Sequence, residues 1–327
     1  MARVKLISPT EYVREATAAV HKATQRVYLM SMVIASHDAT RPLIEAIEAA
    51  ARRGVEVHVA ADVFTFGEVS GGFLPFRYYG HGARDANRMA KRLKKAGVKF
   101  HWLGRGRITL WHGRTHSKWC IVDDMLFTFG GVNLYQGGIE HIDYMFRHKD
   151  APLADRLVEE QKRIQKAELR SNNYPSVAYE HGDMTVLIDG GIIGQSVIYR
   201  RATELAESAS HVTFVSQYCP TGKLSRILKK KNATLFYNRP LQAEGLNRIV
   251  IRFSQFTSGL KTSYKKARYL HAKCIVYTHA DGSKTALTGS HNFAYTGVLL
   301  GTREVALETK DPQIIAQLET FIKKEVA

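Results

Sequence analysis

The chain has 327 residues, 45% of them hydrophobic, and its 47 Lys and Arg against 30 Asp and Glu give a formal net charge of +17. This composition predicts a globular protein and supplies enough apolar residues for two domains or one large pseudo-symmetric domain. The sequence has no run of about 18 apolar residues and no apolar segment of signal-peptide length at its start, so we expect neither a membrane-spanning helix nor a secretory signal.

The positive charge is spread over both halves of the chain, with 22 Lys and Arg against 14 Asp and Glu through residue 150 and 25 against 16 afterwards. A folded basic surface favours an anionic partner, either nucleic acid or the face of an anionic bilayer. The three cysteines, Cys120, Cys219 and Cys274, lack metal-ligand spacing, and two lie in apolar runs. We therefore expect reduced thiols in the core and a cytoplasmic protein.

The first half predicts alternating helices and strands. The expected elements are a helix that begins at 8–11, a strand at 26–32, a helix from 41 to 53, a strand at 55–63, a helix from 85 to 97 and a strand at 98–103. This order favours a largely parallel sheet flanked by helices. A long charged helix should begin at 150–152 and run to about 166.

Residues 171–183 contain Asn, Pro and Gly and are the predicted linker. After it the same succession begins again, with a helix at 196–208, a strand at 212–218, a helix at 223–230, strands at 233–237 and 249–253, and a terminal helix capped at 311–312. The chain is therefore predicted to be a divergent duplication, with one half at 1–170 and the other at 183–327.

One motif occurs in both halves. A His and a Lys stand two residues apart before an apolar strand, and a second apolar run ends in small residues and an Asn. Lys supplies a positive charge for an oxyanion, Asn orients or donates, and small residues let the backbone approach a phosphate. The candidate catalytic residues are His116, Lys118 and Asn133 in the first copy and His271, Lys273 and Asn292 in the second, supported by Gly130, Gly131 and Ser290.

The motif resembles that of the phospholipase D superfamily, which is His-x-Lys-x4-Asp followed by Gly-Gly or Gly-Ser and an Asn. The first copy matches in full through Asp123, whereas the second has Thr278 in place of the Asp and its nearest acid at Asp281. The resemblance implies an α/β fold of two pseudo-symmetric α-β-α sandwich halves with the active site at their interface. It also matches the acidic partner of the His to Asp143 in the first copy and to Glu304 in the second.

Phosphodiester chemistry of this kind requires a nucleophile and an acid. We expect one imidazole to attack phosphorus and form a phosphohistidine while the other protonates the leaving oxygen. The resemblance assigns the nucleophile to His116 and the general acid or base to His271, and the Lys and Asn residues would hold the non-bridging oxygens. No cofactor and no metal are expected, because no carboxylates with ligand spacing surround either His.

Three classes of function follow. The resemblance favours a phosphatidyltransferase or phospholipase similar to the cardiolipin synthase and phosphatidylserine synthase branch, a monomer that binds anionic phospholipid and an alcohol acceptor at the inner membrane surface. The alternative is a metal-independent nuclease of the same superfamily acting on DNA or RNA, which the charge favours. A binding module with a degenerate site is the third, and the intact His and Lys in both copies count against it.

Residues 64–84 are too many for a plain connector. They place aromatic and aliphatic residues such as Phe73 and Leu74 among glycines, which predicts a flap that enters the bilayer interface, with Arg77 and Arg84 at lipid phosphates. Trp102 and Trp111 would extend this surface. The alternative is a loop whose aromatic side chains pack on its own domain.

Overall fold

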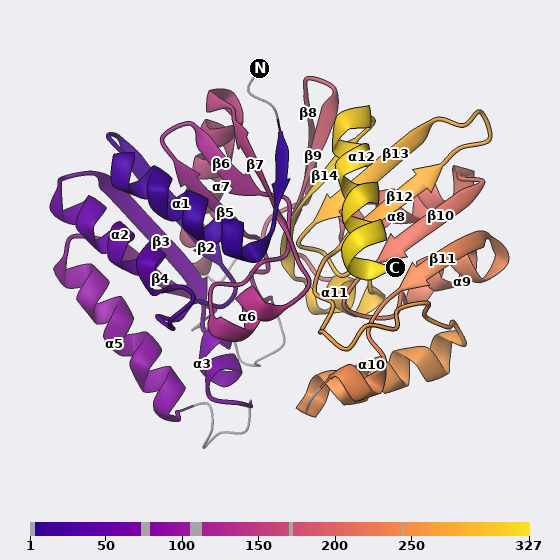
Figure 1. Ribbon diagram of the computed structural model, residues 1–327, viewed down its shortest axis with the longest axis horizontal. Helices are drawn as coiled ribbons and strands as arrows, with labels where there is room; N and C mark the ends of the chain where they lie inside the picture. Colours follow the sequence, from indigo (N-terminus) through magenta and orange to yellow (C-terminus); the bar gives the residue numbers. More distant parts are fainter. Residues whose placement is uncertain (1–3, 73–78, 105–112, 170–172, 244) are drawn as a thin grey trace. The chain divides into compact units, whose positions relative to one another are not determined.

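The computed structural model describes residues 4–72, 79–104, 113–169, 173–243 and 245–327 (Figure 1). The chain forms two compact units. The first holds Met1–Thr128, Val132–Glu140 and Tyr144–Tyr174, and the second holds Phe129–Gly131, His141–Asp143 and Pro175–Ala327. Two short pieces of the predicted first half therefore belong to the second unit.

The first unit contains a seven-stranded sheet in the order β1-β7-β6-β5-β2-β3-β4. Its strands are β1 Lys5–Ile7, β2 Arg26–Ser31, β3 Glu56–Asp62, β4 Lys99–Leu103, β5 Trp119–Val122, β6 Met125–Thr128 and β7 Met145–Lys149. Only β2–β3 and β3–β4 pair in parallel. The strands from which a parallel sheet was predicted, β2, β3 and β4, do pair in parallel. The sheet as a whole is not largely parallel, because β5 and β6 are joined by two residues and such a short connection permits only antiparallel neighbours.

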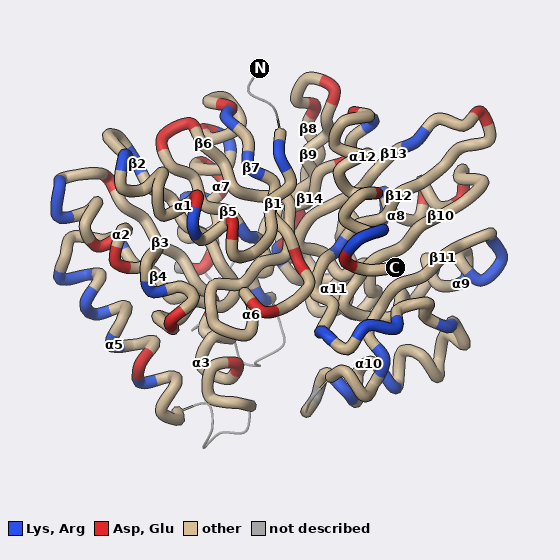
Figure 2. The backbone as a smooth tube through the Cα atoms, in the orientation of Figure 1, with Lys and Arg blue, Asp and Glu red and all other residues tan. Residues whose placement is uncertain are grey.

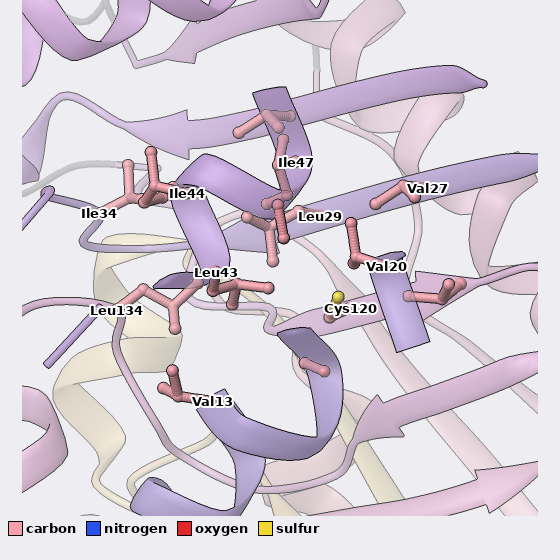
Figure 3. Packing of buried hydrophobic residues seen from close by; sticks show 14 of the residues in the cluster. Val13, Val20, Val27, Leu29, Ile34, Leu43, Ile44, Ile47, Cys120 and Leu134 are labelled. Atoms are coloured by element: carbon pink, nitrogen blue, oxygen red, sulfur yellow. The ribbon is translucent and has the colours of Figure 1, made fainter. Parts of the chain in front are cut away.

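Helices lie on both faces of this sheet. They are α1 Pro9–Lys22, α2 Arg41–Arg52, α3 Phe64–Val69, α5 His81–Lys95, α6 Gln136–Glu140 and α7 Ala151–Leu169. The α1 helix begins where the sequence predicts, with Ser8 and Glu11 forming a capping box. The α1 and α2 helices bury apolar side chains against β2 and β5, as Figure 3 shows for Val20, Leu29, Ile47 and Cys120. On α7, Gln161 accepts a hydrogen bond from Trp119 Nε1 at 2.8 Å.

Part of the segment predicted to be a flap packs on its own unit. Phe66 of α3 is buried with Ala83 and Ala86 of α5, and its ring lies 4.8 Å from the ring of Trp102. Trp102 therefore packs inward and does not extend an exposed aromatic surface. The tip of the predicted flap at 73–78 and Trp111 lie outside the described residues.

The second unit has its own seven-stranded sheet, in the order β11-β10-β12-β13-β14-β9-β8. Its strands are β8 Val177–His181, β9 Met184–Gly190, β10 His211–Val215, β11 Asn232–Phe236, β12 Cys274–Thr278, β13 Lys284–Gly289 and β14 Arg303–Thr309. Its helices are α8 Val197–Ser208, α9 Gly222–Lys230, η1 Pro240–Gln242, α10 Gly245–Ser258, α11 Tyr295–Leu300, α12 Pro312–Phe321 and the π-helix η2 Ile322–Val326. Six strands repeat the order found in the first sheet, since β9-β14-β13-β12-β10-β11 correspond to β1-β7-β6-β5-β2-β3. The fold is α/β with two similar halves, as predicted.

Two predictions for this half are wrong. The predicted linker at 171–183 contains β8, which pairs with β9 along its full length. The predicted strand at 249–253 is part of the helix α10. A short apolar run rich in β-branched residues cannot be distinguished from a helical segment by periodicity alone, and here the run belongs to a helix.

The three cysteines are free and buried. Burial raises the pKa of the Cys120 thiol to about 12, which makes it unreactive. In the part of the chain that the structure describes, no helix combines the length and apolar character needed to cross a membrane.

The Asp123 position shows how the two halves diverged. In the turn after β5, the Asp123 carboxylate accepts hydrogen bonds from the backbone N–H groups of Thr24, Gln25 and Arg26 at 3.1, 2.9 and 3.0 Å. Burial tends to raise the pKa of Asp123, but these hydrogen bonds outweigh it and lower the pKa. Asp123 therefore stabilises the fold and acts at a distance from the motif's His.

In the second half a backbone carbonyl takes the place of the Asp123 carboxylate as the hydrogen-bond acceptor. The carbonyl oxygen of Thr278 accepts from the N–H of Ser210 at 2.8 Å and from its hydroxyl at 2.9 Å. The nearby Asp281 accepts from the N–H and hydroxyl of Ser283 within its own turn. The second half thus joins the same two turns without a carboxylate.

We predict that Asp123→Ala lowers the free energy of unfolding by about 1–3 kcal/mol, because it leaves backbone donors without their acceptor. Thr278→Asp should change it by less than about 1 kcal/mol, since the carbonyl contact needs no acid. Urea denaturation of both variants measures the difference. A stabilisation by Thr278→Asp as large as the loss from Asp123→Ala would contradict this explanation.

Candidate functional site

The second copy of the motif is held by the segment 141–143. Ile142 N–H donates to the Tyr269 carbonyl, and the Ile142 carbonyl accepts from the N–H groups of His271 and Ala272, all at 2.9 Å. This pairing places the Asp143 carboxylate beside the imidazole, with Oδ2 2.7 Å from His271 Nδ1. The side chain of Asp143 is 0% exposed and that of His271 is 10% exposed, so the pair is shielded from water.

The first motif's glycine makes room for this pair. Gly131 N–H donates to Asp143 Oδ1 at 3.2 Å. A Cβ atom at Gly131 would lie 2.7 Å from Asp143 Oδ2 and 3.0 Å from the His271 carbonyl oxygen. Any side chain at this position would push the carboxylate away from the imidazole, so only glycine fits at position 131 without a steric clash.

The structure changes the predicted partner of Asp143. The sequence assigns this carboxylate to the first copy of the motif, yet it pairs with His271 of the second. The register of the two sheets shows that Asp143 and Glu304 are equivalent: Thr128 pairs with Phe146 and Thr288 with Leu307, and the two acids lie three residues before these partners. The pairing of Asp143 with the His of its own copy was therefore predicted wrongly.

The hydrogen bonds at His271 determine which ring nitrogen is available for chemistry. The carboxylate accepts only, so Nδ1 carries the proton that it binds. Lys273 Nζ lies 3.1 Å from Nδ1 and donates to the carbonyl oxygen of His271. Attack on phosphorus or transfer of a proton would therefore use Nε2, the other ring nitrogen.

Several neighbours of His271 were not identified from the sequence. The ring of His141 lies 5.6 Å from that of His271 and 4.9 Å from that of Tyr269. The Tyr269 hydroxyl accepts from Gln217 Nε2 at 3.0 Å. These residues come from three separate stretches with no shared spacing, so the sequence contains no signal that could have grouped them.

The first copy has the same local geometry. His116 and Lys118 directly precede β5, as His271 and Lys273 directly precede β12. Lys118 is buried, and its Nζ donates to the His116 carbonyl at 2.7 Å. In both copies the ammonium is thus folded back onto the backbone of its His.

A buried ion pair fixes the start of the first motif. Asp62, at the end of β3, accepts from Arg114 Nη1 at 2.9 Å and from Thr115 N–H at 3.1 Å. Its carboxylate also accepts from Phe64 N–H at 2.8 Å. A buried charge needs such a full set of partners, so this cluster determines where His116 enters the site.

The two asparagines share one feature. The Oδ1 atoms of Asn133 and Asn292 are buried and have no hydrogen-bond partner among the described residues. Buried polar atoms are nearly always satisfied in native proteins. The same unsatisfied acceptor thus recurs at the equivalent position of both copies.

Glu304 lies on β14 and accepts from the hydroxyl of Ser290, the residue that corresponds to Gly131. It is paired across the sheet with Asp189 of β9. Burial, opposed by a hydrogen bond from Ser196 and reinforced by the charge of Glu304, raises the pKa of Asp189 to about 7. Near neutral pH, Asp189 thus retains a substantial protonated fraction beside Glu304.

Within the described residues, no group of three or more His, Cys, Asp or Glu side chains is placed to hold a metal ion. The groups that can bind an anion here are the Lys ammonium and the Asn amide of each motif. The chemistry of this set suits a phosphate ester, with an imidazole as nucleophile or acid.

Comparison with known proteins agrees with this chemistry. Residues 17–165 match the family described as "Cardiolipin synthase, PLD-like domain". None of the curated proteins matches the sequence.

Solved structures share the fold. The crystal structure of phosphatidylserine synthase from Haemophilus influenzae Rd KW20 matches with a TM-score of 0.71 and 14% identity, over 100% of this chain and 88% of that one. Polyphosphate kinase from Porphyromonas gingivalis matches with a TM-score of 0.62 and 12% identity, over 97% of this chain and 49% of that one.

We predict that Asp143→Asn changes the proton position on His271. The carboxylate can only accept, whereas an Asn amide can donate to Nδ1 and so favour the ring with its proton on Nε2. Nitrogen-15 NMR of the imidazole measures the two forms directly. Asp281→Asn, an exposed acid in the same unit, is the control and should leave the His271 signals unchanged. Unchanged signals in Asp143→Asn would contradict the assigned hydrogen bond.

Proposed function

We propose that the chain acts on phospholipid phosphodiester bonds as a phosphatidyltransferase or phospholipase of the phospholipase D type, through a phosphohistidine intermediate; the match of residues 17–165 to the cardiolipin synthase, PLD-like family supports this. The observation that carries the proposal is the buried Asp143–His271 pair, with Lys273 against the same His. It holds one imidazole in a defined orientation, which general acid–base chemistry requires.

The two motifs supply different halves of one displacement in this proposal. A ring nitrogen of His116 attacks phosphorus, the bond from phosphorus to the leaving alcohol breaks, and the departing oxygen takes the proton from His271 Nε2. His271 Nε2 then removes a proton from the acceptor alcohol or water, whose oxygen attacks phosphorus and releases His116. The Asp143 carboxylate suits the acid role of His271, since it stabilises the positive charge on the protonated ring.

The remaining motif residues stabilise charge in this scheme. Lys118, Lys273, Asn133 and Asn292 bind the non-bridging phosphate oxygens, whose negative charge persists through the transition state. The orienting role predicted for Glu304 stays part of the proposal. Each half of the chain, 1–170 and 183–327, would be a phospholipase D-like half that contributes one motif to a monomeric enzyme.

The lipid assignment is supported by the family description, which names cardiolipin synthase, and by the fold shared with phosphatidylserine synthase. The substrate would be an anionic phospholipid with an alcohol acceptor, taken from a membrane surface by a peripheral, cytoplasmic protein. The second candidate is a nuclease for DNA or RNA, which the net charge of +17 favours.

We predict that His116→Ala and His271→Ala each lower turnover at least about a hundredfold while the fold is retained, because each imidazole serves a separate step. Rapid acid-free quenching should trap a phosphorylated protein that is lost in His116→Ala. His21→Ala, outside both motifs, is the control. A trapped label on His271 would reverse the assignment, and near wild-type activity in either variant would refute a shared reaction.

We also predict that turnover of phosphatidylglycerol survives a strong chelator within about twofold, since Lys and Asn replace the charge of a metal at the phosphate. The assay compares phosphatidylglycerol vesicles with single-stranded and duplex DNA under identical conditions. Cleavage of DNA without turnover of lipid would establish the nuclease. Loss of activity with chelator and its recovery with a divalent ion would refute the mechanism.

A further inference from the structure

The helix α10 has large apolar side chains on its exposed face. Ile249, Phe253 and Phe256 are 64%, 67% and 86% exposed. Their spacing of four and three residues places them on one side of the helix. Leu241, in the short helix η1 just before α10, is 88% exposed. Isolated exposed apolar residues are common, but an aligned row of large ones marks an interaction surface.

The opposite side of α10 anchors it to the second unit. Ile251 and Ser254 are buried, and Ser258 contacts the thiol of Cys219 at 3.1 Å. Arg248 Nε donates to the Ala243 carbonyl at 2.8 Å, which ties α10 to the end of η1. The exposed face is thus presented by a helix whose other face is fixed.

Positive charge is concentrated around this helix. Residues 208–280 contain thirteen Lys and Arg and one acid, Glu244. The excess of positive charge is therefore concentrated in this segment, although the two halves of the chain carry similar totals. Arg248 and Arg252 are exposed on α10 itself, and Lys229 of α9 lies close to Gly259 at its end. Figure 2 shows Lys and Arg along α9 and α10. Apolar tips surrounded by cations are the pattern of a helix that lies in the interface of an anionic bilayer.

A hydrogen-bonded chain connects the inner side of α10 to the surroundings of His271. Asn247 Oδ1 accepts from the Tyr218 hydroxyl at 2.6 Å, and Gln217 Nε2 donates to the hydroxyls of Tyr218 at 2.9 Å and Tyr269 at 3.0 Å. Tyr269 packs on His141, next to the His271 ring. The inner side of α10 is therefore linked to the surroundings of His271 through Tyr218, Gln217 and Tyr269, within the same unit.

We propose that the exposed face of α10, formed by Ile249, Phe253 and Phe256 with Arg248 and Arg252, docks on the surface of an anionic phospholipid bilayer. The aromatic and aliphatic tips enter the acyl boundary and the guanidinium groups bind lipid phosphates. The rings of Phe253 and Phe256 can stack on bases, but Ile249 has no ring, so the full set of side chains fits a lipid better than a nucleic acid. This inference rests on the proposed function, because a lipid substrate is the reason for the chain to bind a bilayer. Binding to the bilayer is nevertheless measured without turnover.

The test is co-sedimentation with vesicles of phosphatidylglycerol and phosphatidylcholine, compared with phosphatidylcholine alone. The double variant Phe253→Ser/Phe256→Ser should bind the anionic vesicles at least about tenfold more weakly than the wild type, because two large side chains no longer leave water. The matched control is Ile193→Ser/Leu299→Ser, which changes two apolar residues that are each 51% exposed elsewhere in the second unit. It should bind like the wild type.

The electrostatic part has its own pair of variants. Arg248→Gln/Arg252→Gln should weaken binding to anionic vesicles and reduce its salt dependence, whereas Lys323→Gln/Lys324→Gln, two exposed cations outside 208–280, should have a smaller effect. Circular dichroism confirms that each variant is folded.

Several outcomes would overturn the proposal. The first is a wild-type protein that does not bind anionic vesicles, and the second is a Phe253→Ser/Phe256→Ser variant that binds them like the wild type. The third is a wild-type dimer that becomes a monomer in this variant while vesicle binding stays unchanged. Loss of DNA binding alone would assign the face to nucleic acid. His271→Ala separates this inference from the proposed function, since it should bind vesicles like the wild type without turnover. Vesicle binding that depends on α10 in a protein with no activity on lipid would support docking and refute the enzyme.

Discussion

The hydrogen bond between Asp143 and His271 is the interaction on which the rest of the site depends. It joins residues 128 positions apart and is almost fully shielded from water. A buried carboxylate is costly unless it is paired, so the surroundings must hold its partners in place. This requires the segment 141–143 to pair with 269–272 and Gly131 to lack a side chain. Both pieces, although close in sequence to the first motif, are parts of the second unit.

The same constraint explains how a duplicated chain diverged. Strand order, register and the Lys contact to its own His carbonyl are alike in both halves, because they determine where the imidazole lies. The Asp123 and Thr278 positions are free to differ, because a turn can be joined by a carboxylate or by a carbonyl with similar hydrogen bonds. The identity of residues near the reacting groups is thus restricted by geometry. The identity of supporting residues is restricted only by the need to give the backbone N–H donors an acceptor.

Features that depend on local sequence could be predicted. The cap at Ser8, the helix at α2 and the two His-x-Lys motifs are encoded within a few residues. The pairing of Asp143 with His271 could not be predicted from one copy of the motif, because nothing local indicates that a segment joins the other unit. The helical state of 249–253 could not be predicted either. Short apolar runs have the same composition in a helix and in a strand, and only tertiary contacts decide between them.

Under the proposed function on lipids, the two sides of α10 would have separate roles. A phospholipid keeps its acyl chains in the bilayer, whereas its phosphate must reach buried groups such as Lys273 and His271. A helix with an apolar outer face and an inner face hydrogen-bonded toward Tyr269 satisfies both requirements with one rigid element. A nucleic acid offers stacking bases to Phe253 and Phe256 but no acyl phase to Ile249, so under the proposal the apolar face favours a lipid where net charge favours neither substrate.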